Sequence, residues 1–118
     1  MNSLQFIHTI NLHDSILDNM VYDYQHKTVI MTIDFAFWMQ SNYKKSEPET
    51  GMIQLTFSNV ADFQAPKEID YGNTSFLGCT LKDDSLIFIL LNDFTDDTFE
   101  IKILAGAVDF QKLSSENQ

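Results

Sequence analysis

Apolar and polar residues alternate most clearly within residues 28–37, and the pattern there predicts a strand with one buried face. A period of two is typical of a half-buried strand, because successive side chains point to opposite faces of a sheet. The preceding residues 16–23 fit either a short helix behind Asp14 or a second strand. The strand is favoured because residues 24–27 form a short polar reversal that leads directly into the strong alternation. The expected inward side chains of the 28–37 strand are Val29, Met31, Ile33, Phe35 and Phe37.

The same pattern predicts short strands along the rest of the chain. Residues 4–10 alternate and are expected to form a first strand, which would bury His8 together with Phe6 and Ile10. Leu86–Leu91 is apolar on both faces, as in a central strand that is covered on both sides. The other expected strands lie at 51–57, at 74–81 and 85–91 (a hairpin that turns at 82–85), at 99–103 and at 107–110, and residues 58–63 are expected to form a bend or a short strand.

About eight short strands separated by turn signals indicate a mostly β fold, either an antiparallel β-sandwich or a partly open barrel. A minor helix at 14–20 or near 60–70 would make the fold α+β with the same architecture. At 118 residues the chain fits a single domain, residues 1–118, that can bury one core. The polar tail at 113–118 is expected to fray.

The chain has a formal net charge of −10, and the charge is unevenly distributed. Residues 61–118 contain eleven acidic residues and four lysines, whereas residues 1–60 contain six and three. All seven basic residues are lysines, and recognition of phosphates and base edges relies heavily on arginine, so nucleic-acid binding is disfavoured. An acidic surface either steers a basic protein partner or keeps the domain soluble, and solubility is the commoner explanation.

Cysteine usage and the N-terminal sequence bear on the compartment. The single cysteine, Cys79, excludes an intramolecular disulfide and favours a reducing environment. The first ten residues lack the basic and apolar regions of a signal peptide, and no stretch approaches the roughly 18 apolar residues of a membrane span. We therefore expect a cytoplasmic protein without membrane association.

The His13-Asp14-Ser15 segment is the first candidate for chemistry. A His-Asp dipeptide occurs in metal-dependent phosphohydrolases together with further His and Asp ligands, and no second such segment is present here. The favoured interpretation is a structural turn in which Asp14 accepts backbone N–H bonds. The alternative is a small metal-dependent hydrolase centred on His13 and Asp14. Convergence of His8, His13 and His26 on a metal has no support from their spacing.

No other motif predicts a catalytic, metal or cofactor site. Residues 92–97 are rich in Asp but lack the glycine and the distal glutamate of a calcium loop. Cys79 lies in an expected strand and reads as a core residue. Because no glycine-rich phosphate loop is present, we expect no cofactor.

Protein binding is the remaining class of function, and two groups of residues are candidates for it. Trp38 and Tyr43 close the long strand and enter the polar loop at 39–50, so they form a protein-contact patch if they are exposed. The competing interpretation, which we favour, is that Trp38 plugs one end of the sandwich. The acidic candidates are Asp83, Asp84, Asp93, Asp96 and Asp97.

The segment LHDSILDNMVYDYQHKTVIMTIDF resembles the opening of a group of small uncharacterised bacterial proteins, in which LHDS precedes a strand, a hairpin and a second strand. Some members are classed as immunity proteins of polymorphic-toxin systems. IQLTFSNVADF and FEIKILAGAVDF are similar to the middle and closing strands of that group. The resemblance implies a mostly β bacterial domain without established enzymatic activity, which binds a cognate protein if it is an immunity protein. The expected function is therefore non-enzymatic protein binding, with a homo-oligomeric structural subunit as a further alternative.

Overall fold

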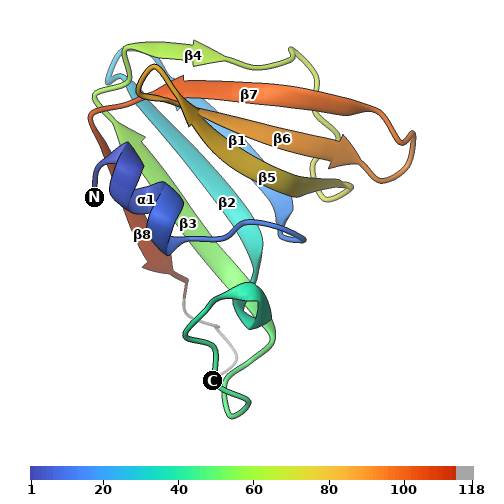
Figure 1. Cartoon of the computed structure of the whole chain (residues 1–118). Coiled ribbons are helices and arrows are strands. Elements are labelled where there is room, and N and C mark those ends of the chain that lie inside the picture. The colour runs from blue at the N-terminus through green and yellow to red at the C-terminus, as the bar shows by residue number, and fades with distance from the viewer. Residues whose placement is uncertain (114–118) are drawn as a thin grey trace.

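The computed structural model of the chain describes residues 1–113. They form one short α-helix, one 3-10 helix and eight strands (Figure 1). The elements are α1 (Ser3–Thr9), β1 (Ile16–Asp23), β2 (Thr28–Ala36), η1 (Phe37–Met39), β3 (Thr50–Ser58), β4 (Asp62–Gln64), β5 (Thr74–Lys82), β6 (Ser85–Asn92), β7 (Thr98–Leu104) and β8 (Ala107–Lys112).

All the strands pair antiparallel in one open sheet, in the order β4-β7-β6-β5-β1-β2-β3-β8. This confirms the expected mostly β fold of about eight strands. The sheet has two halves, β4-β7-β6-β5 and β1-β2-β3-β8. They are joined where β1 pairs with β5 through one residue pair, Ile16 with Ser75. Most of the pairing therefore lies within the halves and little of it between them.

The core lies between the two halves, with α1 across the concave side of the sheet (Figure 1). Phe57 in β3 and Phe88 in β6 belong to strands that are not neighbours, yet their ring centroids are 5.9 Å apart. Phe6 of α1 lies 6.3 Å from Phe57 and 6.2 Å from Phe88, in edge-to-face geometry. Such aromatic pairs add roughly 0.5–1.5 kcal/mol each beyond their burial. The sheet therefore curls until its two halves pack against each other and against α1.

The prediction of a strand at 4–10 is wrong, because this segment contains α1. A capping box starts the helix: the Gln5 N–H donates to Asn2 Oδ1 at 2.8 Å, and the Asn2 N–H donates to Gln5 Oε1 at 2.9 Å. Such reciprocal capping satisfies two N–H groups that a helix start leaves free. Phe6 is buried but His8 is exposed, contrary to the expected strand parity. The helix also lies outside both places where a minor helix was expected, 14–20 and 60–70.

The alternating strand at 28–37 is confirmed with one adjustment at its end. The four inward side chains expected within β2 are buried, and β2 stops at Ala36, so that Phe37 starts η1 instead. The expectation that Leu86–Leu91 is covered on both faces is wrong. Leu86, Phe88 and Leu90 are fully buried, whereas the alternate residues on the outer face of β6 are only half-buried. β6 is central within its half of the sheet, but that sheet carries its core on one face.

The side of β1 that faces away from β2 is covered by the 65–73 connection. The Gly72 N–H donates to the Leu17 carbonyl at 3.0 Å, and the Tyr71 hydroxyl donates to the Met20 carbonyl at 3.3 Å. An uncovered strand edge is a template for unwanted pairing, and a crossing loop is one way in which proteins protect it. Of the tail that was predicted to fray, residues 114–118 lie outside the described residues. The Leu113 N–H donates to the Met52 carbonyl at 3.0 Å.

Candidate protein-binding surface

The seven residues expected to contact a partner lie in three separate places. Asp83 and Asp84 form the turn between β5 and β6, whereas Asp93, Asp96 and Asp97 lie in the loop between β6 and β7. These two acidic groups are at opposite ends of β6 (Figure 1). The nine residue steps from Asp84 to Asp93 correspond to about 30 Å in an extended strand. The five aspartates therefore do not form one acidic face.

Several of these aspartates have local roles in their turns. Asp83 and Asp84 have positive φ angles of 50° and 65°, as the two central residues of a type I′ hairpin turn require. Asp96 also has a positive φ, of 61°. Asp93 Oδ1 accepts a hydrogen bond from the Ser75 hydroxyl at 3.1 Å. Turn conformation thus accounts for three of the five aspartates without a partner.

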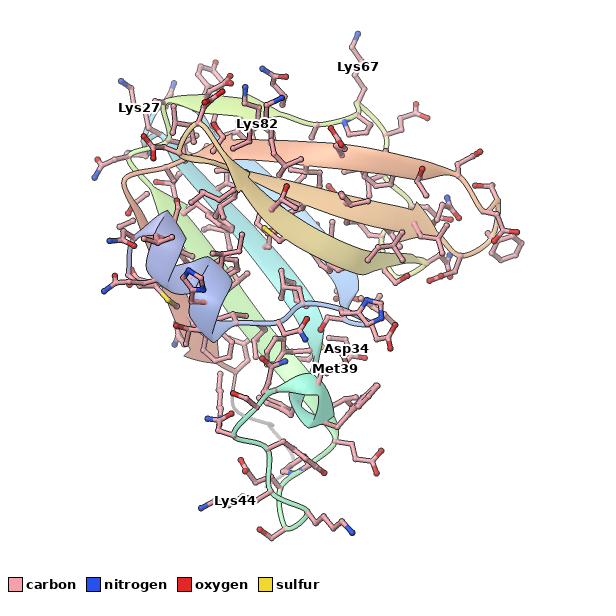
Figure 2. All side chains as sticks on the ribbon, viewed as in Figure 1. Lys27, Asp34, Met39, Lys44, Lys67 and Lys82 are labelled. Carbon is pink, nitrogen blue, oxygen red and sulfur yellow. The ribbon has the colours of Figure 1, made fainter. Side chains whose placement is uncertain are left out.

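Trp38 and Tyr43 lie in η1 and the loop that follows it. Trp38 is 45% exposed, so the expectation that it plugs one end of the sandwich is wrong. Phe37 packs inward in its place, with its ring 5.1 Å from that of Phe35. The Tyr43 hydroxyl donates to the Glu47 carbonyl within the same loop. Figure 2 shows this loop, with Lys44, at the end of the molecule remote from Lys27 and Lys82.

The loop after η1 is fastened to the segment that follows α1. Gln40 donates through Nε2 to the Asn11 carbonyl at 2.7 Å and accepts from the Asn11 N–H at 3.0 Å through Oε1. Beside this contact is a hollow of about 140 Å³ that opens between the end of α1, the loop and β8. Its walls include Ile10, Phe35, Phe37, Tyr43, Phe110 and Lys112.

The LHDS segment forms the corner between the two halves of the sheet. Ser15 is fully buried, and its Oγ accepts the Ala36 N–H at 2.9 Å, while its carbonyl accepts the Phe76 N–H at 2.8 Å. His13 Nδ1 is 2.9 Å from the Leu77 carbonyl. Asp14 has a positive φ of 65°, and its N–H donates to the Phe76 carbonyl. The corner thus contacts β2 and β5 at once, which gives the motif a structural explanation.

The details of this corner differ from the turn that we expected. Within the turn itself, the side chain that accepts a backbone N–H is that of Asn11, which bonds the His13 N–H at 3.0 Å, rather than that of Asp14. Asp14 Oδ1 is 3.4 Å from His13 Nε2, and both side chains are about half exposed. One ring nitrogen of His13 is thus engaged with the main chain, and the other lies close to the Asp14 carboxylate.

Residues 1–113 contain neither a cluster of metal ligands nor a thiol with a lowered pKa. No group of three or more His, Cys, Asp or Glu side chains in that range could hold a metal ion. Cys79 is partly buried against the core, and burial raises the pKa of its thiol to about 12. The thiolate is the reactive form of cysteine, so a raised pKa describes an inert side chain.

An aromatic cluster that the sequence analysis missed lies at the far end of β1. The Tyr22 ring is 4.6 Å from that of Phe63 in β4 and 6.3 Å from that of Tyr24. Tyr71, which bonds Met20 on the same strand, extends the cluster along β1. Tyr22, Tyr24 and Tyr71 are 40%, 72% and 38% exposed. We call Tyr22, Tyr24, Phe63 and Tyr71 the tyrosine surface.

The position of the tyrosine surface follows from the short length of β4. Tyr22 pairs with the buried Val29, so its side chain lies on the inner face of the sheet. β4 contributes only three residues there, and of these Phe63 packs on the Tyr22 ring. Tyr24 is already in the turn and is left in solvent. The two tyrosines on either side of Asp23, at the start of a polar reversal, could have indicated this surface from the sequence. Exposed turns are usually built from small and polar residues, so two aromatic rings there are unusual.

The tyrosine surface is flanked by more acidic than basic residues. Asp18 and Asp23 lie on β1 around Tyr22, and Glu68 and Asp70 precede Tyr71 in the 65–73 connection. Lys27 lies in the turn after β1, and Lys67, which projects outward in Figure 2, lies in the 65–73 connection. These segments therefore contain four acidic residues and two lysines, so their net charge is negative.

Asp23 is held in the charged form by its neighbour in the turn. His26 Nδ1 lies 2.7 Å from Asp23 Oδ2, and the His26 N–H donates to Asp23 Oδ1 at 3.2 Å. The hydrogen bond from the His26 side chain lowers the pKa of Asp23 below its usual value, with a further contribution from the backbone bond. The Asp23 carboxylate, which lies on the face of β1 opposite to Tyr22 and precedes Tyr24 in the turn, is therefore ionised throughout the neutral range.

Comparisons with known proteins do not add to this geometry. None of the helices in the part of the chain that the structure describes has the length and apolar character needed to span a bilayer. No family model matches the sequence, and searches of curated proteins and of solved structures find no match either.

Proposed function

We propose that this protein is a non-enzymatic, cytoplasmic protein-binding domain and that it contacts its partner through the tyrosine surface. The observation that carries the proposal is the exposure of three tyrosines close to the end of β1: Tyr22 on the strand and packed on Phe63, Tyr24 in the turn that follows, and Tyr71 bonded to the Met20 carbonyl. Tyrosine offers a large, rigid contact area with a polar end, and it is enriched at the centres of protein interfaces. Most proteins leave single apolar side chains in solvent, so a cluster is the informative feature.

The charge around the tyrosine surface supports a basic partner. Ionised Asp23 lies between Tyr22 and Tyr24 in the sequence, and Asp18, Glu68 and Asp70 add negative charge nearby. Arginine and lysine side chains stack on tyrosine rings through cation–π interactions, and surrounding carboxylates strengthen the attraction. This proposal replaces the acidic loops of β6 as the main contact, since those loops lie at opposite ends of the strand.

The resemblance of the LHDS segment to immunity proteins gives a more specific version of the proposal. In that version the partner is a bacterial toxin with a basic surface, and the domain inhibits it by covering that surface. The single cysteine, which leaves no partner for an intramolecular disulfide, supports a reducing compartment for this function.

The proposal is tested by comparing two variants with exposed side chains, one in the turn after β1 and one on β1 itself. Tyr24→Ser removes the most exposed ring of the tyrosine surface, whereas Val21→Ser changes a side chain that is 52% exposed on the opposite face of β1. Tagged wild-type and variant proteins are used to capture partners from the native lysate at low and high salt. We expect a basic protein that is captured by the wild type and by Val21→Ser but lost with Tyr24→Ser.

Capture at low and at high salt tests whether charge contributes to the proposed contact. A cation–π and ion-pair contact weakens as salt screens the exposed charges, over a Debye length of about 10 Å at 0.1 M. Equal capture by all three proteins would contradict the role of the tyrosine surface. Only self-association, seen as a concentration-dependent mass, would favour a homo-oligomeric subunit, and stoichiometric metal that is lost in His13→Ala would favour the hydrolase.

A further inference from the structure

The edge of β8 that faces away from β3 has a defined hydrogen-bonding pattern. The Val108 N–H donates to the Met1 carbonyl at 2.7 Å, and the terminal ammonium of Met1 donates to the Val108 carbonyl at 2.9 Å. On the other edge, the Leu113 N–H donates to the Met52 carbonyl of β3. Successive residues of a strand direct their main-chain groups to alternate sides. The even-numbered residues of β8 therefore face away from the sheet.

Met1 occupies one position of this edge and leaves the next two open. Phe110 and Lys112 direct their N–H and C=O groups to the same side as Val108, and no residue within 1–113 bonds those groups there. Met1 pairs with Val108 as a one-residue extension of the sheet. An added strand would therefore start opposite Phe110 and continue past Lys112, with four main-chain groups to bond.

The hollow beside Gln40 lies on the inner face of this same edge. Phe110 and Lys112 both line it, and Lys112 Nζ is 5.1 Å from the centre of the Phe37 ring. A residue that pairs with Phe110 directs its side chain to the same face as the Phe110 ring, and so toward the hollow. At about 140 Å³ the hollow has room for one side chain. Its walls are apolar at Phe35, Phe37 and Phe110 and polar at Gln40 and Glu47, so an apolar side chain would pack on the three phenylalanine rings.

We propose that the β8 edge binds an extended peptide segment of a partner protein by strand addition, with an apolar side chain in the hollow and an acidic side chain two residues away against Lys112. The ion pairs of residues 1–113 give Lys112 no carboxylate within 4.0 Å, so the ammonium is available to a ligand. In strand addition the main-chain bonds supply affinity and alternate side chains supply specificity. This site is separate from the tyrosine surface and goes beyond the function proposed above.

A second copy of the chain does not meet these requirements. The inward residues of its own β8 are Val108, Phe110 and Lys112, which include no carboxylate. Pairing Phe110 with Lys112 of another copy would place a lysine at each hollow and leave both cations without a counter-ion. A different polypeptide with an apolar-x-acidic segment fits the edge better.

Selection from a phage library of random seven-residue peptides tests the inference directly. We expect peptides selected on the wild-type protein to share an apolar residue and an Asp or Glu two positions apart. Lys112→Gln should weaken their binding at least tenfold and remove the preference for the acidic residue. Gln111→Ala is the matched control, because its side chain lies on the outer face of β8, and it should leave binding unchanged.

Synthetic copies of a selected peptide, each N-methylated at one amide, test the strand geometry without altering the protein. Methylation of the amides that face β8 should abolish binding, and methylation of the alternate amides should not. Absence of a shared pattern, or equal effects of methylation at every amide, would overturn the inference. Peptides that lose binding with Tyr24→Ser but not with Lys112→Gln would also overturn it, while supporting the tyrosine surface.

Discussion

Replacing Ser15 with alanine tests whether the LHDS corner holds the two halves of the sheet together. The hydroxyl is fully buried and accepts the Ala36 N–H at the end of β2, at 2.9 Å. Alanine keeps the packing volume nearly constant but removes the acceptor. Ala36 is itself buried, so water does not replace the lost bond. The expected effect is that of leaving one buried N–H group without a partner.

The size of that effect is about 1–3 kcal/mol of unfolding free energy. For a domain of this length, a change of 1 kcal/mol lowers the melting temperature by roughly 4 °C, so Ser15→Ala should melt about 4–12 °C below the wild type. His13→Ala should cost less, below about 1 kcal/mol, because its side chain is half exposed and makes one neutral hydrogen bond. The order of the two variants is therefore a prediction in itself.

Urea unfolding followed by far-UV circular dichroism measures both variants against a matched control. Ser85→Ala changes another buried serine, for which the structure gives no backbone N–H donor to Oγ within residues 1–113, and it should cost distinctly less than Ser15→Ala. If Ser15→Ala and Ser85→Ala shift the urea midpoint equally at the same m-value, the argument from the corner is refuted. A large loss from His13→Ala with none from Ser15→Ala would instead point to a role for the imidazole.

Three further predictions concern single groups. Cys79 should react with iodoacetamide at pH 8 about 10–100 times more slowly than a free thiol, because its pKa of about 12 leaves very little thiolate. The higher nucleophilicity of that thiolate offsets part of this loss. Rapid alkylation of the native protein would contradict the prediction. In His26→Ala the pKa of Asp23 should rise toward its usual value by NMR titration. The depressed pKa of Asp23 contributes stability that is present above its unfolded-state pKa and is lost as the pH falls through its folded-state pKa, so the variant should lose less stability in acid than the wild type. Replacing Asp83-Asp84 with Asn-Gly should raise the unfolding free energy by about 0.5–1 kcal/mol, because both positions have positive φ; a lower urea midpoint would show that the aspartates do more than form the turn.

The strands could be predicted wherever one face of a segment is buried and the other is exposed to solvent. β2 is the clearest case, since burial alternates along it as its sequence does. The helix at Ser3–Thr9 was missed because an alternation over so few residues fits a strand, while Phe6 and Ile10 also lie on one face of a helix. The capping box of Asn2 and Gln5 was the signal that decided between the two. Local hydrogen bonding prevailed over an apparent period of two.

The candidate site was less predictable because it depends on where strands end. Trp38 and Phe37 are adjacent aromatic residues, and only the start of η1 after Ala36 decides that Phe37 turns inward. Tyr22 has the parity of a core residue, and it is exposed because β4 stops after three residues. The sequence also did not show that the Asp83–Asp84 turn and the 93–97 loop lie at opposite ends of β6. Exposure at the ends of strands is a property of the assembled sheet.

The pairing of β8 with β3 has a consequence for the order of folding. β1, β2 and β3 follow one another in the chain as neighbours in the sheet, and so do β5, β6 and β7, so each set can form from contacts close in sequence. β8 joins the first set only after the second has been synthesised, and Met1 pairs with Val108. On the ribosome, the free edge of β3 therefore stays unpaired until residues 107–112 have been synthesised. We expect the hydrogen-bonded amides between β3 and β8 to acquire protection last during refolding, after those within the two three-stranded units.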